Sequence, residues 1–142
     1  KQWPIQNMVE LVGRLSEQGL GIPLLIGGPE EQGRVDQFQA LLKQPMVSLV
    51  GKVDLPTLAA LLKQCNLLVS NDSGPVHVAS MVGTPTVTLF EGPDAQVRAK
   101  RWGPIGSDHT LLVEEGEEQH LSVDSVSSAI RQQLLQSESK AS

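Results

Sequence analysis

Two patterns of apolar residues alternate along the chain: helical spacing and short continuous runs. Helical spacing predicts helices at about 5–18, 30–43, 54–64, 74–82 and 123–135. Apolar runs bounded by turn residues predict buried strands at 24–26, 46–50, 67–70, 86–90 and 111–113. The stretch 91–104 has a looser pattern and is expected to be mainly loop. The polar end, 136–142, is expected to be a frayed tail.

Residues that start and stop helices support these boundaries. Gly19 and Gly21 follow the first helix, where glycine commonly ends a helix. Asp54 is a favoured residue at a helix N-terminus, and Pro56 suits the first turn that follows it. Gly83 is expected to end the helix at 74–82.

The order of elements predicts the fold class. Strands separated by helices of about ten residues require parallel pairing through right-handed crossovers. The sequence therefore predicts an α/β fold with a doubly wound, Rossmann-like parallel sheet, in a single domain over 1–142. Ligands of such sheets bind at the carboxyl ends of the strands. The loops after Ile26, Val50, Ser70 and Phe90 are expected to share that edge.

Composition excludes several classes of protein. The chain has 142 residues, a formal net charge of -5 and a sequence pI near 5.1. This balance argues against a general binder of nucleic acids or anionic membranes, because phosphate polymers select basic surfaces. Cys65 is the single cysteine, so the sequence gives no sign of an oxidising compartment and predicts a cytoplasmic setting. No apolar run approaches the ~20 residues that cross a bilayer, and the N-terminus has no signal-peptide pattern.

The turn at 71–77 carries the strongest indication of chemistry. A tight passage from a strand into a helix directs the free N–H groups of the first helical turn toward a ligand, and anions bind there. On local evidence alone, capping is the better explanation of Asp72, Ser73 and Pro75, because these residue types are favoured at a helix start whether or not a ligand binds. His77 would point toward the same edge as the N–H groups and favours the binding interpretation.

Other loops carry weaker indications. The chain has neither G-x-G-x-x-G nor G-x-x-x-x-G-K-[ST], so the fingerprints of dinucleotide and P-loop sites are missing. Gly27 and Gly28 allow a ligand to approach the backbone, and Glu30 and Glu31 beyond them are suited to bind ribose hydroxyls.

The titratable residues form no cluster with metal-ligand spacing. The three histidines, His77, His109 and His120, are scattered, and Asp72 has no second carboxylate close by in the motif. We therefore expect a site that works without a metal or other cofactor.

Four segments carry a resemblance to a known family. They are 69–79 with its continuation 82–90, Lys1-Gln2-Trp3-Pro4, Gly27-Gly28-Pro29-Glu30-Glu31, and Trp102-Gly103-Pro104. In order and spacing they resemble glycosyltransferase family 9, which includes the ADP-heptose:lipopolysaccharide heptosyltransferases. The resemblance covers roughly 1–105. It departs from the family at Phe90-Glu91-Gly92-Pro93-Asp94-Ala95, where a glutamate is inserted after the phenylalanine and the final proline is lost.

The resemblance implies a GT-B enzyme, in which two Rossmann-like domains face each other across a cleft. The chain resembles the C-terminal, donor-binding half. Its start at Lys1 then indicates that the N-terminal acceptor domain, with the general base, lies outside this sequence. The isolated piece is expected to be inactive.

The resemblance also implies roles for individual residues. Asp72 would lie near the donor sugar, Lys1 would neutralise the diphosphate, Glu31 would bind the ribose and Val53 would pack against the base. The remaining donor-site residues would supply close backbone approach or the diphosphate turn: Gly27, Gly28, Ser73, Gly74, Pro75, Val76 and His77.

The function implied is transfer of a sugar, expected to be heptose, from a nucleotide-diphosphate donor such as an ADP-sugar to a lipopolysaccharide core acceptor. The acceptor would bind through the other domain, with peripheral contact at the cytoplasmic face of the inner membrane and no role for nucleic acid. Two alternatives stay open: a non-catalytic nucleotide or nucleotide-sugar binding module, and a nucleotide-sugar epimerase of similar fold.

The remaining conspicuous residues have structural interpretations. Trp3 and Trp102 are expected to pack at the rim of the domain, and Cys65 to be an inert thiol on an apolar helix face. The glutamates from 114 to 118 are expected to form a solvated acidic patch, and the pair at 100–101 a solvated basic one.

Overall fold

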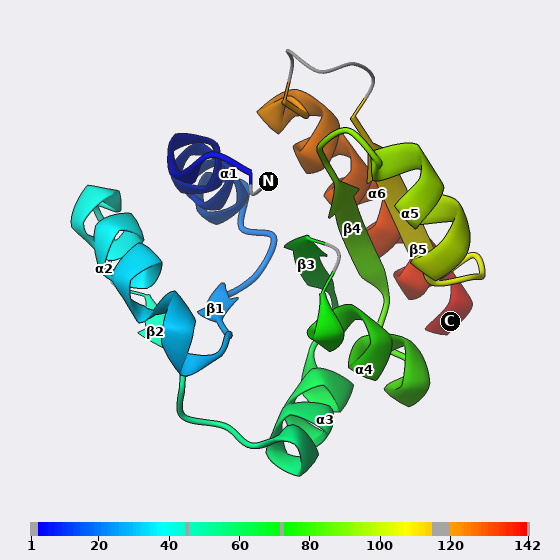
Figure 1. The fold of residues 1–142 in the computed structure, drawn as a ribbon, viewed down its shortest axis with the longest axis horizontal. Helices are drawn as coiled ribbons and strands as arrows, with labels where there is room; N and C mark the ends of the chain where they lie inside the picture. The colour runs from blue at the N-terminus through cyan, green and yellow to red at the C-terminus, as the bar shows by residue number, and fades with distance from the viewer. Residues whose placement is uncertain (1–2, 45, 72, 115–119, 142) are drawn as a thin grey trace.

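The computed structural model describes residues 3–44, 46–71, 73–114 and 120–141. Helices and strands alternate through these residues, as Figure 1 shows. The helical elements are α1 (Ile5–Glu17), η1 (Pro29–Glu31), α2 (Gln32–Leu41), α3 (Leu55–Gln64), α4 (Gly74–Val82), α5 (Ala95–Trp102) and α6 (Val123–Ala141). The strands are β1 (Leu24–Leu25), β2 (Val47–Ser48), β3 (Leu68–Asn71), β4 (Thr86–Phe90) and β5 (His109–Val113).

All described strand pairs are parallel, as predicted, but they form two sheets where the sequence predicts one. A two-stranded sheet pairs β1 with β2, and a three-stranded sheet has the order β3-β4-β5. β1 and β2 contain two residues each, so their ladder is short. Pro23 precedes β1 without an N–H to donate, and Gly27 follows it, which limits the length of this strand.

β4 is the centre of the larger sheet, and all five of its residues are buried. Alternate side chains point to opposite faces of a strand. Val87 and Leu89 pack in one cluster with Trp3, Leu11 of α1 and the apolar face of α6. Phe90, on the opposite face, packs against Ala95 and Ala99 of α5. The sheet is therefore covered on both faces, which is why β4 has no exposed face and even Thr86 and Thr88 are buried.

A separate cluster joins α3 and α4 to the start of β3. It consists of Leu62, Leu68, Val76, Val78 and Ala79, with Ile26 packed against it from the end of β1. The Thr84 hydroxyl donates a hydrogen bond of 2.6 Å to Leu62 O, which fixes the end of α4 to α3. Ile26 thus links the two sheets through side-chain packing.

The predicted helix ends are confirmed where a cap residue defines them. Asp54 accepts a hydrogen bond of 2.9 Å from the Thr57 N–H, with Pro56 in the first turn of α3. The hydrogen bond from the Thr57 side chain, with the backbone bond, lowers the pKa of Asp54. Gly83 ends α4 in the left-handed conformation, with φ of 81°. α1 ends at Glu17, one residue before the predicted position.

Two predictions of irregular structure were wrong. The segment expected to be loop contains α5, whose buried face consists of Ala95 and Ala99. Alanine is only weakly apolar, so the spacing of these residues did not indicate a helix. α6 continues to Ala141, so most of the expected frayed tail is helical. No described helix is both long and apolar enough to cross a membrane.

The two tryptophans differ in environment. Trp3 is 2% exposed and lies in the core cluster under α6, as a packing residue should. Trp102 is 59% exposed, so the expectation that it packs at the rim was wrong. Cys65 is the half-buried C-cap residue of α3, so its expected place in the core on a helix face was wrong. Burial raises the pKa of its thiol, which fits an inert role.

Candidate functional site

The loops after β1 and β2 lie side by side. The parallel pairing continues past both strands, because the Gly51 N–H donates to Gly27 O at 2.8 Å. The loop after β1 therefore lies at the same edge of the smaller sheet as the loop after β2. The first loop contains Gly27, Gly28 and Glu31, and the second leads to Val53. Four of the predicted donor-site residues thus belong to neighbouring loops.

Close packing explains why the first of these loops contains glycines. A Cβ at Gly27 would come within 3.3 Å of Glu31 Cγ and 3.8 Å of Val50 Cγ2. A Cβ at Gly28 would overlap the Glu30 carboxylate at 2.3 Å. Gly27 lets the chain come close to Glu31, which stays only partly covered, whereas the exposed Glu30 side chain could move away from a Cβ at Gly28.

The turn after β3 leads directly into α4, as predicted. Ser73 is the N-cap residue in extended conformation, but its side chain makes no capping hydrogen bond. Its hydroxyl lies 3.0 Å from Ser70 Oγ at the end of β3. The Ser73 hydroxyl therefore does not satisfy the free N–H groups at the start of α4, which weakens the purely structural explanation for this serine.

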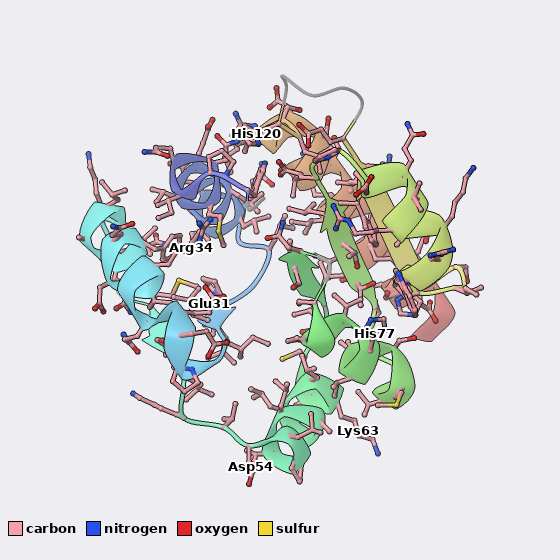
Figure 2. All side chains as sticks on the ribbon, viewed as in Figure 1. Glu31, Arg34, Asp54, Lys63, His77 and His120 are labelled. Carbon is pink, nitrogen blue, oxygen red and sulfur yellow. The ribbon has the colours of Figure 1, made fainter. Side chains whose placement is uncertain are left out.

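The predicted turn residues divide into buried and exposed ones. Val76 is 1% exposed in the α3–α4 cluster, and its N–H donates to Ser73 O at 3.2 Å. Pro75 has no N–H to offer. Gly74 and His77 are exposed, and Figure 2 shows His77 on α4, well separated in that view from Glu31 beside β1. Val76 thus acts as a packing residue that positions the turn.

Two predicted residues, Lys1 and Asp72, lie outside the described residues. The segment next to Lys1 is held by two hydrogen bonds: Trp3 Nε1 donates to Leu121 O at 2.7 Å, and Arg34 Nη2 donates to Trp3 O. Arg34 comes from α2 and is labelled in Figure 2. No sequence pattern indicates this role of Arg34, because the contact joins residues 31 positions apart.

A cluster that the sequence did not predict lies at the ends of β4 and β5. Glu91, Glu114 and His120 each offer a ligand atom, and these atoms all lie within 4.8 Å of one another. Glu114 is 4% exposed and accepts a 2.7 Å hydrogen bond from the Gly92 N–H, so its placement in a solvated acidic patch was wrong. The cluster also corrects the view that the histidines are all scattered.

His109 lies at the opposite end of β5 from this cluster. Its Nδ1 is 2.9 Å from Thr86 Oγ1 on the neighbouring strand. Burial lowers the pKa of His109, and the charge of Asp108 opposes that shift in part. Because this pair lies at the amino ends of the strands, His109 has a structural role, away from the ligand edge.

Comparison with known proteins identifies the family. The model of glycosyltransferase family 9 (heptosyltransferase) matches residues 1–129. The chain belongs to glycosyltransferase family 9. It is 31% identical over 122 residues to lipooligosaccharide heptosyltransferase 2 of Haemophilus influenzae, covering 82% of this chain and 34% of that protein. It is 30% identical over 97 residues to lipopolysaccharide heptosyltransferase 3 of Escherichia coli, covering 66% of this chain and 28% of that protein.

Solved structures of the family share the fold. A family 9 glycosyl transferase from Veillonella parvula superposes with a TM-score of 0.82 at 26% identity, covering 96% of this chain and 42% of that one. ADP-heptose heptosyltransferase II of E. coli superposes with a TM-score of 0.80 at 25% identity, covering 97% and 43%. E. coli heptosyltransferase WaaC, solved with ADP, has a TM-score of 0.73 at 25% identity.

These likenesses confirm the predicted fold class and family. The chain has the parallel α/β fold of GT-B glycosyltransferases. It spans about a third of the length of the first curated relative and just over two fifths of the solved chains. The roles of individual donor-site residues stay predictions.

Proposed function

We propose that this chain is the donor-binding part of a heptosyltransferase, one that transfers heptose from ADP-heptose to a lipopolysaccharide core acceptor. The start of α4 carries the proposal, because the Ser73 hydroxyl turns to Ser70 and makes no capping bond to the first N–H groups of the helix, which attract anions. A similar protein, WaaC, was solved with ADP.

The diphosphate is assigned to this turn. Among the described residues of the turn, Val76 donates its N–H to Ser73 O and Pro75 has none, so the N–H groups of Ser73, Gly74 and His77 are assigned to the diphosphate. The positive end of the α4 dipole adds to their attraction for phosphate. Asp72 is assigned to the donor sugar, and Lys1 to neutralising the diphosphate.

The nucleoside is assigned to the loops after β1 and β2. Glu31 is only partly covered and lies against Gly27, so its carboxylate is available for ribose hydroxyls. Val53, half-buried at the approach to α3, supplies an apolar surface for the base. Ile26 supports this arrangement because it packs against the cluster that contains Val76.

The proposed chemistry places no metal or other cofactor at the diphosphate. Charge develops on the departing phosphate during transfer, and oriented N–H groups with a cation stabilise that charge. The acceptor and the general base that deprotonates its hydroxyl are assigned to an N-terminal domain, this chain being the C-terminal half. The site of action is then the cytoplasmic face of the inner membrane.

Titration of ADP by calorimetry into the protein at its full natural length tests the donor site. The exposed His77 imidazole is assigned a hydrogen bond to the diphosphate beside its backbone N–H, and His77→Ala removes the imidazole alone. A hydrogen bond to a charged group is worth about 1.5–3 kcal/mol, so His77→Ala should weaken ADP binding about 10- to 100-fold. Met81→Ala is the matched control, because Met81 is 79% exposed on the same helix. Equal ADP affinity of both variants would reject the assignment of His77.

An assay of heptose transfer with ADP-heptose tests the reaction itself. Transfer that falls with ADP affinity in His77→Ala supports the enzyme. Donor binding without transfer in the full-length protein would instead support the non-catalytic binding module. Conversion of the nucleotide-sugar without an acceptor would support the epimerase.

A further inference from the structure

Three segments far apart in sequence meet at the carboxyl edge of the larger sheet. Glu91 follows β4, Glu114 follows β5 and His120 precedes α6. The register Phe90↔Val113 continues past the strands, because the Glu114 N–H donates to Phe90 O at 2.8 Å. Parallel pairing therefore places the two glutamates at the same level of the sheet.

The burial of these glutamates is the unusual observation. Glu91 is 2% exposed and Glu114 is 4% exposed, whereas acidic side chains rarely lose their water without a compensating partner. Glu91 Oε2 lies 2.6 Å from His120 Nδ1, but Glu91 Oε1 is buried and has no hydrogen-bond partner among the residues that the structure describes. An unpaired buried oxygen loses its hydration without compensation, and the loss is greater for a charged group. The site therefore lacks one partner for its negative charge.

We propose that Glu91, Glu114 and His120 bind a divalent transition-metal ion, of which Zn²⁺ is the best match. Their ligand atoms lie within 4.8 Å of one another, and a zinc ion holds oxygen and nitrogen ligands at about 2.0–2.2 Å. To bind one ion, the three side chains must turn toward a common centre, and the proposal includes that adjustment. The ion replaces the proton shared by His120 Nδ1 and Glu91 Oε2, and that proton leaves to solvent.

The donor set decides the class of ion. An imidazole nitrogen with carboxylate oxygens suits Zn²⁺ and neighbouring first-row ions, while Mg²⁺ and Ca²⁺ prefer all-oxygen sites. The His120 side chain is 37% exposed, so an ion has access from this side. The site differs from ordinary exposed acidic groups because two of its three ligands are buried.

The ion would connect the ends of three elements. Glu114 also accepts the Gly92 N–H, so an ion on Glu114 fixes the start of the loop between β4 and α5. The same loop is anchored by Arg98, which donates to Glu91 O. We assign the ion a structural role at this edge. The proposal stands on these contacts alone and does not depend on donor binding.

Calorimetric titration of Zn²⁺ into the metal-free protein, at its full natural length, tests the proposal. His120→Ala should weaken Zn²⁺ binding by about 10-fold or more, since loss of even an indirect partner of a metal typically costs 10–100-fold. Glu91→Gln should do the same. Glu138→Gln, an exposed carboxylate on α6, is the matched control and should bind as the wild type does.

The outcomes are distinct. Binding lost in both cluster variants and kept in the control supports the site, as does stronger binding of Zn²⁺ than of Mg²⁺. Equal Zn²⁺ affinity of all the proteins, or no binding at concentrations that saturate ordinary zinc sites, would overturn it. Should Glu91→Gln fail to fold, His120→Ala decides the matter because His120 lies at the surface.

Discussion

Replacement of Trp3 by phenylalanine tests how the segment beside the proposed donor site is held. Trp3 is 2% exposed, packs under α6 and donates a 2.7 Å hydrogen bond to Leu121 O. Arg34 donates to its carbonyl oxygen. Phenylalanine keeps an aromatic ring in the core but loses the N–H and part of the volume.

The expected loss of stability has two parts. Removing the hydrogen bond and leaving Leu121 O without this donor costs about 1 kcal/mol, because Leu121 is only half-buried. The space left by the smaller ring costs about 1–2 kcal/mol, at the lower end of values for large-to-small changes in a core. Trp3→Phe should therefore lower the free energy of unfolding by about 2–3 kcal/mol, a large share of the stability of an ordinary domain.

Trp102→Phe is the matched control, because Trp102 is the other tryptophan of the chain and is 59% exposed. Its free energy of unfolding should stay within about 0.5 kcal/mol of the wild type. Urea denaturation followed by far-ultraviolet circular dichroism measures both variants without relying on tryptophan fluorescence. Equal destabilisation by the two changes would refute the anchoring role of Trp3.

Two further predictions concern His109 and a pair of glycines. Because burial lowers the pKa of His109 from 6.5, the unfolded chain binds more protons just below that pH, so the free energy of unfolding should fall as pH drops through 6.5. This fall should be smaller in His109→Asn when urea midpoints are compared, and an unchanged pH dependence would contradict it. Gly33→Ala in α2 meets open space and should stabilise the protein by about 0.5–1 kcal/mol. Gly103→Ala would place Cβ 2.5 Å from Ala99 O and should destabilise the protein by at least about 1 kcal/mol. Thermal unfolding measures both variants, and stability changes of the same sign would contradict the packing described at these two glycines.

The sequence predicted the fold class because its signals are local. Apolar runs marked β3 and β4, and residues such as Asp54 and Gly83 marked helix ends through their own backbone chemistry. α5 was missed because its buried side chains are alanines, whose burial depends on Phe90 packing above them. That contact is a tertiary one and produces no periodic pattern of apolar residues in the sequence.

The strands of the smaller sheet show a second limit of sequence reasoning. Runs at 24–26 and 46–50 have the composition of buried strands, but only Leu24–Leu25 and Val47–Ser48 pair. Pairing depends on register and on what lies beside each strand. The link between the sheets is made instead by Ile26, in the α3–α4 cluster.

The candidate site was predictable where consecutive residues build it. Gly27 and Gly28 precede Glu31 in one loop, and Ser73 precedes His77 in one turn, so their chemistry is visible in short motifs. The role of Val76 was not visible, because an apolar residue in a binding motif is indistinguishable by sequence from a core residue. In the structure Val76 is only 1% exposed, so it is a packing residue.

Glu91, the glutamate inserted into the family pattern, has a structural explanation. In sequence, Glu91 is an interruption between Phe90 and Gly92. In the fold it is buried at the end of the central strand, where a carboxyl group requires partners. Those partners, Glu114 and His120, stand 23 and 29 residues further along, and only the parallel register of β4 and β5 brings them together. The partners of the buried Glu91 carboxyl group therefore belong to no local sequence motif. Its role can be recognised only from the order and pairing of the strands.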